Sequence, residues 1–265
     1  MFDRAFEGKV ALITGGSSGL GRTTAIMFAT AGAKVVVAAR RVEEGLQTID
    51  MIEKAGGTGR FIRTDVRSAT EVAALVEGAL STYGRLDCAV NNAGGSRSGG
   101  TGKPGPFQSE PESFFDSQIA ANLKSVWLCL QQEIPTIARS GGGAIVNISS
   151  VAGIMGTINY TTYGAAKGGV VALTRGAAAE AAESNVRVNA IAVGAIRTPA
   201  WDGVPASELD ALAQTNPLKR FGEAEHIGGA ALWLCSRFGE FVTGQCITID
   251  GGRTALGYPG VRRST

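Results

Sequence analysis

Short runs of apolar, often β-branched residues alternate along the chain with longer segments in which apolar residues recur at helical spacing. The short runs are continuously apolar, which is typical of strands covered on both faces. The longer segments mix Ala, Leu and Glu, and many begin near Ser, Thr, Asp or Glu, as helices do. The predicted strands are Lys9–Thr14, Lys34–Ala39, Gly59–Thr64, Leu86–Asn91, Ala144–Ser149, Val186–Val193 and Cys246–Asp250. The predicted helices are Leu20–Ala31, Glu43–Ala55, Glu71–Tyr83, Phe114–Arg139, Gly164–Ala182 and Ala224–Ser236.

Strands that alternate with helices imply βαβ units, right-handed crossovers and a parallel sheet. We therefore predict an α/β fold: a single doubly wound (Rossmann) domain over residues 1–265, with a seven-stranded parallel sheet and helices on both faces. Ligands of such sheets bind beyond the carboxyl ends of the strands. Two segments that follow strands are expected to cover that region as loops. They are a long Gly-, Pro- and Ser-rich loop at residues 95–111 and a lid loop at residues 194–216.

Composition narrows the function classes. With 44% hydrophobic and 18% charged residues the chain is not intrinsically disordered, and its 38 glycines have no collagen period. A net charge of +2 with scattered Lys and Arg argues against a nucleic-acid partner. No apolar stretch is long enough for a membrane helix, and the N-terminal one is too short for a signal peptide. The cysteines lack metal-ligand spacing, so we expect small buried side chains in a reducing cytoplasm and no metal site. They are Cys88, Cys129, Cys235 and Cys246.

The first predicted strand runs directly into a glycine-rich turn, Thr14–Gly21, with the spacing G-x-x-x-G-x-G. Glycine allows a tight turn whose backbone N–H groups approach a diphosphate, and the following helix points its positive end at the same anion. Such a turn is also compatible with a plain strand-to-helix connection; its place after the first strand favours nucleotide binding. The candidate contacts are Gly15, Ser17, Ser18, Gly19, Leu20 and Gly21.

The end of the second predicted strand bears on the choice between NADP(H) and NAD(H). An acidic residue there would bind a ribose 2′-hydroxyl, whereas an arginine accommodates a 2′-phosphate. The chain has Arg40 and Arg41 at this place and no acid, which favours NADP(H), with NAD(H) possible. The alternative is that the two arginines form a solvated cap paired with Glu43 and Glu44.

Tyr163 and Lys167 lie four residues apart in a predicted helix, so both side chains share one face. A free tyrosine has a pKa near ~10, and a lysine ammonium one turn away favours the phenolate and lowers that value. A Y-x-x-x-K pair alone is common. Ser150 adds weight to it, because this hydroxyl follows a predicted strand thirteen residues upstream and could hydrogen-bond a substrate oxygen.

Together these segments resemble the short-chain dehydrogenase/reductase family, including its 3-oxoacyl-acyl-carrier-protein reductase-like members. The resemblance runs from about Gly8 to Gly252, and the motifs occur in the family's order. They are Thr14–Gly21, Asp65-Val66, Asn91-Asn92-Ala93-Gly94, Asn122, Ser150, Tyr163-x-x-x-Lys167, Asn189-Ala190, Thr198 and Asp250-Gly251-Gly252.

The resemblance implies a role for each matching residue. Tyr163 would be the general acid or base, Lys167 would lower its pKa and bind the nicotinamide ribose, and Ser150 would orient the substrate oxygen. Asn122 would hold a proton relay through a water. The adenosine contacts would be Asp65, Val66, Asn92, Ala93 and Gly94; the nicotinamide end would meet Gly194, Ile196 and Thr198.

Several of these residues also have plain structural explanations. Asn91 and Asn92 could stabilise a turn, and Asn122 could be a satisfied polar group of a helix. Ser149 could be mistaken for the catalytic serine. His226, the only histidine, is expected at a helix start or on the surface, and Trp201 could be a loop anchor or a substrate contact.

The chain departs from the family pattern in three places. Val193-Gly194 replaces the usual Pro-Gly, the loop at residues 95–111 is longer, and the tail at residues 253–265 lies beyond the resemblance. The family's habit of tetramer formation implies a homotetramer that the tail could help to build.

The resulting hypothesis is a cytoplasmic oxidoreductase that acts on CH–OH groups, with NADPH-dependent reduction of a small-molecule ketone favoured. One alternative is an NAD-dependent alcohol, sugar or steroid dehydrogenase that runs oxidatively, and another is a nucleotide-binding protein without turnover. Substrate identity and reaction direction stay open. Met155, Asn159, Tyr160 and Trp201 suggest a mixed, moderately apolar pocket, with Arg97 the one charged candidate.

Overall fold

The computed structural model describes residue 2, residues 4–96 and residues 105–255. Within them lie seven strands: β1 (Val10–Thr14), β2 (Lys34–Ala39), β3 (Thr58–Arg63), β4 (Cys88–Asn91), β5 (Gly143–Ser150), β6 (Val186–Val193) and β7 (Cys246–Ile249). The α-helices are α1 (Gly19–Thr30), α2 (Val42–Lys54), α3 (Ala69–Tyr83), α4 (Glu112–Ile119), α5 (Ser125–Arg139), α6 (Thr161–Ala181), α7 (Ala206–Gln214) and α8 (Ala224–Cys235).

The strands form one parallel sheet in the order β3-β2-β1-β4-β5-β6-β7. The chain therefore starts in the middle of the sheet, winds outward to β3, and returns to β4 on the other side of β1. This reversal between β1 and β4 is the switch point at which doubly wound sheets bind ligands. The predicted fold class is confirmed.

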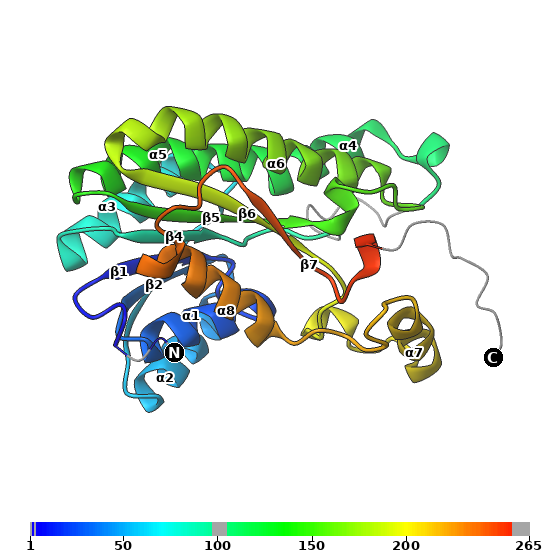
Figure 1. The fold of residues 1–265 in the computed structure, drawn as a ribbon, viewed down its shortest axis with the longest axis horizontal. Helices are drawn as coiled ribbons and strands as arrows, with labels where there is room; N and C mark the ends of the chain where they lie inside the picture. Colours follow the sequence, from blue (N-terminus) through cyan, green and yellow to red (C-terminus); the bar gives the residue numbers. More distant parts are fainter. Residues whose placement is uncertain (1, 3, 97–104, 256–265) are drawn as a thin grey trace.

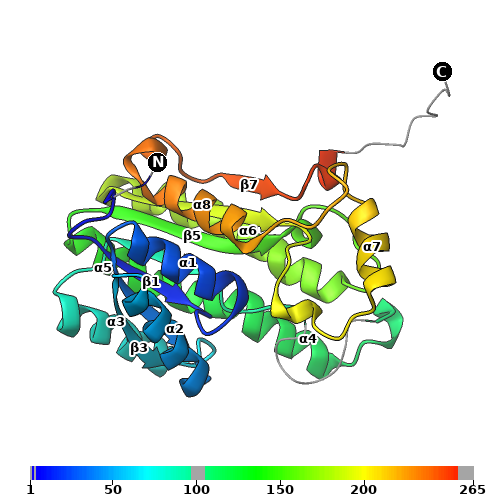
Figure 2. The same ribbon diagram turned by 90° about the horizontal axis from the view of Figure 1, so that it is seen from below.

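Two layers of helices cover the sheet (Figure 1). Alternate residues of β1 separate the two cores: Ala11 and Ile13 pack toward α1, α2 and α8, while Val10 and Leu12 pack toward α3, α5 and α6. Both faces of the central strands are therefore buried, which explains their continuously apolar sequences. Figure 2 shows the same sheet with α1 and α2 in front of it.

The outer strands depart from the expectation of burial on both faces. The residues of β3 are either exposed or partly buried, and no residue of β7 is fully buried. Each has a neighbouring strand on one side only, so its outer residues meet solvent.

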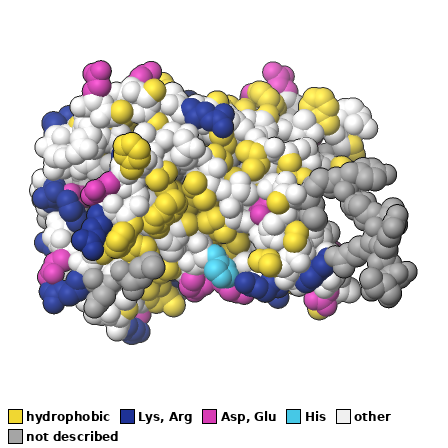
Figure 3. All heavy atoms as spheres, in the orientation of Figure 1, with side chains coloured by type: hydrophobic (Ala, Val, Ile, Leu, Met, Phe, Trp, Pro, Cys, Tyr) yellow, Lys and Arg dark blue, Asp and Glu magenta, His cyan; other side chains and the backbone are white. Residues whose placement is uncertain are grey.

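Capping signals mark several helix ends. The hydroxyl of Ser68 accepts a hydrogen bond from the backbone N–H of Glu71 at the start of α3, and Gly84 ends that helix in the left-handed conformation, with φ of 75°. At the start of α8, Nδ1 of His226 accepts a hydrogen bond of 2.8 Å from the backbone N–H of Glu223. His226 is exposed, and it is the cyan side chain of Figure 3, beside the hydrophobic side chains that gather over α1 and α8.

Two predicted segments have a different structure from the one expected. The single helix expected at Phe114–Arg139 is α4, a π-helical turn at Ala120–Lys124 and α5. The lid segment contains α7, and a bridge pairs Ile196 with Gly222. The long loop at residues 95–111 includes a 3-10 turn at Phe107–Ser109, but residues 97–104, with Arg97, lie outside the described residues. Residues 256–265 of the tail also lie outside them.

Candidate active site

The glycine-rich turn lies at the carboxyl end of β1 and opens α1. Gly15 and Gly19 have φ of +68° and +51°, in the region that favours glycine. Gly21 is required for another reason, because a Cβ at that position would lie 2.3 Å from the carbonyl oxygen of Gly15. The turn can therefore fold back on the first turn of α1 only without a side chain there. Ser17, Ser18 and Leu20 complete it.

Two residues that the sequence analysis did not single out brace this turn from outside. Arg22 donates to the carbonyl oxygen of Ser17 at 2.5 Å, and to the hydroxyl of Thr48 at 3.0 Å. Thr48, buried on α2, donates to the carbonyl oxygen of Gly16 at 3.0 Å. No sequence motif links Arg22 and Thr48 to the glycine-rich turn, so their contacts with it become visible only once the packing of α2 is known.

Arg41 points back at the same turn from the end of β2. Its Nη2 atom donates to the hydroxyl of Ser18 at 2.8 Å and to that of Ser17 at 3.2 Å. Its Nη1 atom pairs with Glu44 at 2.9 Å, so one of the two partners of the solvated-cap alternative is present. Arg40 is exposed.

A cavity of about 200 Å³ opens between the turn and the ends of β2, β3 and β4. Hydrogen bonds from Arg67 hold the pKa of Asp65 below its ordinary value there, and burial opposes this lowering only in part. The cavity is lined, among others, by Gly15, Ser17, Ser18, Arg40, Arg41, Asp65, Val66, Arg67, Ala93 and Gly94.

The segment after β4 is tied to the glycine-rich turn through Thr14. The hydroxyl of Thr14 accepts hydrogen bonds from the backbone N–H groups of Asn92 and Ala93, at 3.0 and 3.1 Å. The amide of Asn92 donates to the carbonyl oxygen of Thr14 at 3.0 Å. Asn92 thus does stabilise a turn, the glycine-rich turn that follows β1. Next along the chain is Gly94, where a Cβ would lie 2.6 Å from Oδ1 of Asn122.

Asn122 is fully buried on the π-helical turn between α4 and α5. Its Oδ1 atom accepts a hydrogen bond of 2.8 Å from the backbone N–H of Gly95, and its Nδ2 atom donates to Oε1 of Gln118 at 2.9 Å. The side chain therefore joins the helix to the segment after β4. A π-helical turn places one more residue in the turn than an α-helix does, and such turns are frequent at functional sites.

Ser150, Tyr163 and Lys167 line a second cavity of about 170 Å³, which shares Gly94 with the first. Ser150 ends β5, and its hydroxyl accepts a hydrogen bond of 3.2 Å from the backbone N–H of Ala152. Lys167 is buried; its Nζ atom donates to the carbonyl oxygen of Ile148 at 2.8 Å and lies 5.9 Å from the centre of the Tyr163 ring. Ser149 also lines this cavity, but its hydroxyl donates to the carbonyl oxygen of Lys167 at 2.9 Å, a contact between β5 and α6.

The pKa of Tyr163 differs from the value expected from its spacing to Lys167. Removal from water raises the pKa of Tyr163 to about 12, although a hydrogen bond with Ser150 lowers it in part. Burial lowers the pKa of Lys167 to about 8. The expected lowering of the tyrosine pKa by the lysine was wrong for this structure, because the loss of hydration dominates and Lys167 is directed at a backbone carbonyl.

The lid segment begins against the carboxyl end of β6. Gly194 lines the second cavity and packs on Asp250, whose Cα would lie 2.6 Å from a Cβ at that position. Ile196 is buried, and Thr198 approaches the glycine-rich turn at Gly19. Trp201 donates through its indole N–H to the carbonyl oxygen of Ile196 at 2.9 Å and makes an edge-to-face contact with Phe221, as a loop anchor does.

Comparison with known proteins assigns this arrangement to a family. Residues 15–254 match the family model described as enoyl-(acyl carrier protein) reductase. The chain is 38% identical to 7alpha-hydroxysteroid dehydrogenase from Escherichia coli over 247 residues, which are 93% of this chain and 94% of the relative. It is 38% identical to a 3-oxoacyl-[acyl-carrier-protein] reductase from Thermotoga maritima over 249 residues, 93% of this chain and 98% of the relative.

A solved structure shares the fold closely. It is 7alpha-hydroxysteroid dehydrogenase in complex with NADH and 7-oxo glycochenodeoxycholic acid, with a TM-score of 0.88 at 37% identity. The match covers 95% of this chain and 96% of that one. The chain belongs to the short-chain dehydrogenase/reductase family. It is accordingly an oxidoreductase that acts on CH–OH groups with a nicotinamide cofactor.

The residues present fit the cofactor of a short-chain dehydrogenase/reductase. The glycine-rich turn leaves no room for a side chain at Gly21, and two adjoining cavities run from Arg41 to Tyr163 at the carboxyl ends of the strands. A dinucleotide needs such a divided site, with a turn for the diphosphate and a pocket on either side.

Among the described residues no group of three or more His, Cys, Asp or Glu side chains could hold a metal ion. Cys88 and Cys129 are buried and the other two cysteines partly so; all four are free thiols. In the described part of the chain, no helix has the length and apolar character needed to cross a membrane.

Proposed function

We propose that this short-chain dehydrogenase/reductase reduces a ketone to a secondary alcohol with NADPH, using Tyr163 as the general acid. The observation that carries the proposal is the pairing of Tyr163 with Ser150 at one cavity. Burial keeps the pKa of Tyr163 near 12, so its hydroxyl holds a proton throughout the neutral range and can donate it.

The roles of the other side chains follow from their places. A nicotinamide bound in the second cavity would supply the hydride for the carbonyl carbon. Ser150 would hold the carbonyl oxygen, Tyr163 would protonate it, and the ammonium of Lys167 would stabilise the tyrosinate left behind. Asn122 keeps the segment beyond Gly94 against this cavity and, through a water, would pass the proton relay toward solvent.

The first cavity is the proposed adenosine site. Asp65 and Val66 would contact the adenine, and the segment from Asn92 to Gly94 the adjoining ribose. The absence of an acid at the end of β2, together with Arg41 beside Ser17 and Ser18, supports recognition of a 2′-phosphate. Ile196 and Thr198 would meet the nicotinamide end.

The first test compares binding of NADPH and NADH by titration with fluorescence detection. We expect tighter binding of NADPH by the unmodified protein. We expect Arg41→Ala to weaken NADPH binding roughly 10- to 100-fold, as loss of a charge-assisted contact would, and NADH binding far less. Arg139→Ala, at the far end of α5, is the matched control. Tighter NADH binding would contradict the cofactor assignment, and binding of neither would contradict the proposed function.

The second test is a panel of ketones. Ile154 and Ile158, between β5 and α6, have exposed side chains (42% and 87%), so the region beside Ser150 offers apolar contacts. We expect bulky or cyclic ketones to be reduced more efficiently than small polar ones. Turnover only of small, charged ketones would contradict this expectation.

One observation supports a competing function, the oxidation of an alcohol rather than the reduction of a ketone. The solved relative binds NADH and a 7-oxo bile acid, so an NAD-dependent dehydrogenase of a steroid or another cyclic alcohol is the second candidate. It predicts NAD⁺-dependent oxidation of cyclic alcohols at a rate above that of NADPH-dependent ketone reduction.

Assembly and location remain predictions. We expect a homotetramer, with Phe115 on α4 and Trp127 on α5 among the residues covered, since both have large exposed apolar side chains (48% and 43%). Light scattering that gives the mass of a monomer would contradict this. The free thiols accord with the expected cytoplasmic location.

A further inference from the structure

A buried acid lies beneath the active site without any part in the proposed chemistry. Glu133, on α5, is 1% exposed. Its Oε2 atom accepts a hydrogen bond of 2.8 Å from the amide of Asn91, and its Oε1 atom has no hydrogen-bond partner among the residues that the structure describes. An ionised carboxylate with one amide donor in an apolar interior is strongly disfavoured.

In the described part of the chain, the groups that face Glu133 supply no positive charge. From β4 it meets Asn91; beyond it, the same amide donates to Asn147 of β5 at 3.0 Å, and Asn147 donates to Thr174 of α6 at 2.9 Å. On α5 itself the titratable neighbour is Cys129, a buried thiol. None of the ion pairs among residues 4–96 and 105–255 includes Glu133. Burial accordingly raises the pKa of Glu133 to about 7.

The contact between Glu133 and Asn91 connects to the nucleotide site through one peptide bond. Asn91 is the last residue of β4, and Asn92 follows it. The backbone N–H groups of Asn92 and Ala93 both donate to Thr14, whose carbonyl oxygen also accepts from the amide of Asn92. A shift of the Asn91 side chain would therefore be transmitted to the turn that begins at Gly15.

We propose that Glu133 is a positioning residue for the cofactor: as an uncharged carboxylic acid it fixes the amide of Asn91 and, through the end of β4, the turn at Thr14 and Gly15. Loss of its proton leaves a buried carboxylate with a single amide donor. The rearrangement that brings this charge further donors moves Asn91 and weakens nucleotide binding. The inference rests on the proposed nucleotide site, because it assumes that the turn binds the diphosphate.

The test compares the pH dependence of nucleotide binding in the unmodified protein and in Glu133→Gln. Glutamine has the same shape and stays neutral. NADPH has its own phosphate, which titrates near ~6, and Lys167 also titrates, but both proteins share these groups. The informative quantity is therefore the ratio of the two Kd values at each pH between 5.5 and 8.5. Glu183→Gln, an exposed carboxylate at the far end of the sheet, is the matched control.

We expect the Kd of the unmodified protein to increase roughly three- to tenfold more than that of Glu133→Gln over this range, since one unit of pKa difference between free and bound states is a tenfold change. We expect kcat at saturating cofactor to be nearly equal in the two proteins at every pH. Parallel Kd curves would overturn the inference while leaving the proposed function intact. Absence of NADPH binding by the unmodified protein would instead contradict the proposed function.

A second measurement needs no variant and no cofactor. Infrared spectroscopy of the unmodified protein detects the C=O stretch of a buried protonated carboxylic acid. We expect such a band at pH 5.5 that disappears as the pH rises through about 7. A carboxylate signal that is constant over this range would overturn the inference even if Glu133→Gln failed to fold.

Discussion

At the scale of single residues, the hydroxyl of Tyr163 is the group on which turnover should depend most. Because its pKa lies near 12, removing the hydroxyl removes the proton donor without changing any charge at neutral pH. Tyr163→Phe should therefore lower kcat roughly 10²- to 10⁴-fold and leave the affinity for NADPH nearly unchanged. Steady-state kinetics and a binding titration on the same preparation test this. Full turnover by Tyr163→Phe would contradict the assigned mechanism.

Lys167 should set the alkaline limit of the reductive reaction. Its pKa is lowered to about 8, so the ammonium is lost as the pH rises through that value. The tyrosinate formed in each turnover then has no positive charge beside it, and kcat for reduction should fall. We expect the fall to have an apparent pKa near 8, measured with saturating ketone and NADPH. Lys167→Arg, which keeps its charge, should abolish the fall near 8; an unchanged profile would contradict the assignment.

The residues of the site differ in how far the sequence could predict them. Ser150, Tyr163 and Lys167 were brought together by spacing, and the structure places them at one cavity. Arg22, Thr48 and Glu133 were missed, because each acts through a contact with a residue of another element. No local sequence pattern distinguishes such a residue. Arginine and glutamate are common in helices, and their role becomes visible only from the residues that they contact.

At the scale of elements, the contact between Gly153 and α6 sets the distance from Ser150 to Tyr163. A Cβ at Gly153 would lie 2.6 Å from the backbone carbon of Lys167, so Gly153→Ala must push α6 away from the end of β5. We expect Gly153→Ala to lose about 1–3 kcal/mol of stability, as overpacking does, and most of its kcat.

Gly176→Ala on the same helix is the matched control for Gly153→Ala. Gly176 is exposed, and a Cβ there meets nothing within 4 Å, so we expect a gain of about 0.5–1 kcal/mol and unchanged kinetics. Chemical denaturation and steady-state kinetics measure both variants. Equal behaviour of the two would show that the contact with α6 does not position the catalytic residues.

The bounds of strands and helices were predicted well where the local sequence permits one structure, and poorly where it permits two. β2 and β6 have the predicted bounds, because a continuous apolar run between turns has few other solutions. The residues of the π-helical turn at Ala120–Lys124 are ones that an α-helix also accepts, and the contact of Asn122 with Gly95 comes from another segment of the chain. α7 had a signal, a proline followed by Ala, Glu and Leu, but the surrounding glycines and prolines favoured a loop.

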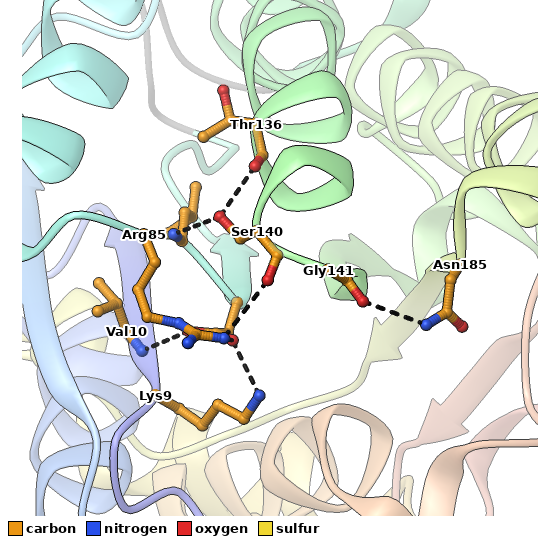
Figure 4. A network of polar contacts seen from close by, with 9 residues as sticks. Lys9, Val10, Arg85, Thr136, Ser140, Gly141 and Asn185 are labelled. Atoms are coloured by element: carbon orange, nitrogen blue, oxygen red, sulfur yellow. Dashed lines mark hydrogen bonds and ion pairs between the residues drawn. The ribbon is translucent and has the colours of Figure 1, made fainter.

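At the scale of the whole molecule, the candidate active site lies at the carboxyl ends of the strands, and a cluster of polar contacts around Asp87 lies at their amino-terminal ends. We call this cluster the clamp. At the amino-terminal ends of β1 and β4, Asp87 is 2% exposed and accepts hydrogen bonds from Lys9 at 3.0 Å, Arg85 at 2.6 and 2.8 Å and the backbone N–H of Val10 at 3.0 Å. Figure 4 shows Arg85 also reaching Ser140, at the end of α5. This clamp joins the two strands whose other ends form the proposed nucleotide site.

Asp87→Asn should therefore reduce stability without changing the chemistry. Lys9 and Arg85 are about half exposed, so water screens part of the loss, and we expect about 1–3 kcal/mol by chemical denaturation. Asp50→Asn, in the exposed pair with Lys54, should change stability by less than about 0.5 kcal/mol.

The cost of Asp87→Asn should also depend on pH. Burial opposes ionisation of Asp87, but the hydrogen bonds from Arg85, Val10 and Lys9 outweigh it and hold its pKa below the ordinary value of 3.8. A carboxylate with a lowered pKa stabilises the fold above that ordinary value, and its contribution is lost as the pH falls through the lower, folded-state pKa. The stability difference between Asp87→Asn and the unmodified protein should thus be constant from neutral pH down to about 4 and shrink below it. A stability difference that persists under strongly acidic conditions would show that Asp87 acts through packing rather than through its charge. A loss of kcat per folded molecule would show that the clamp and the active site are coupled through β1 and β4.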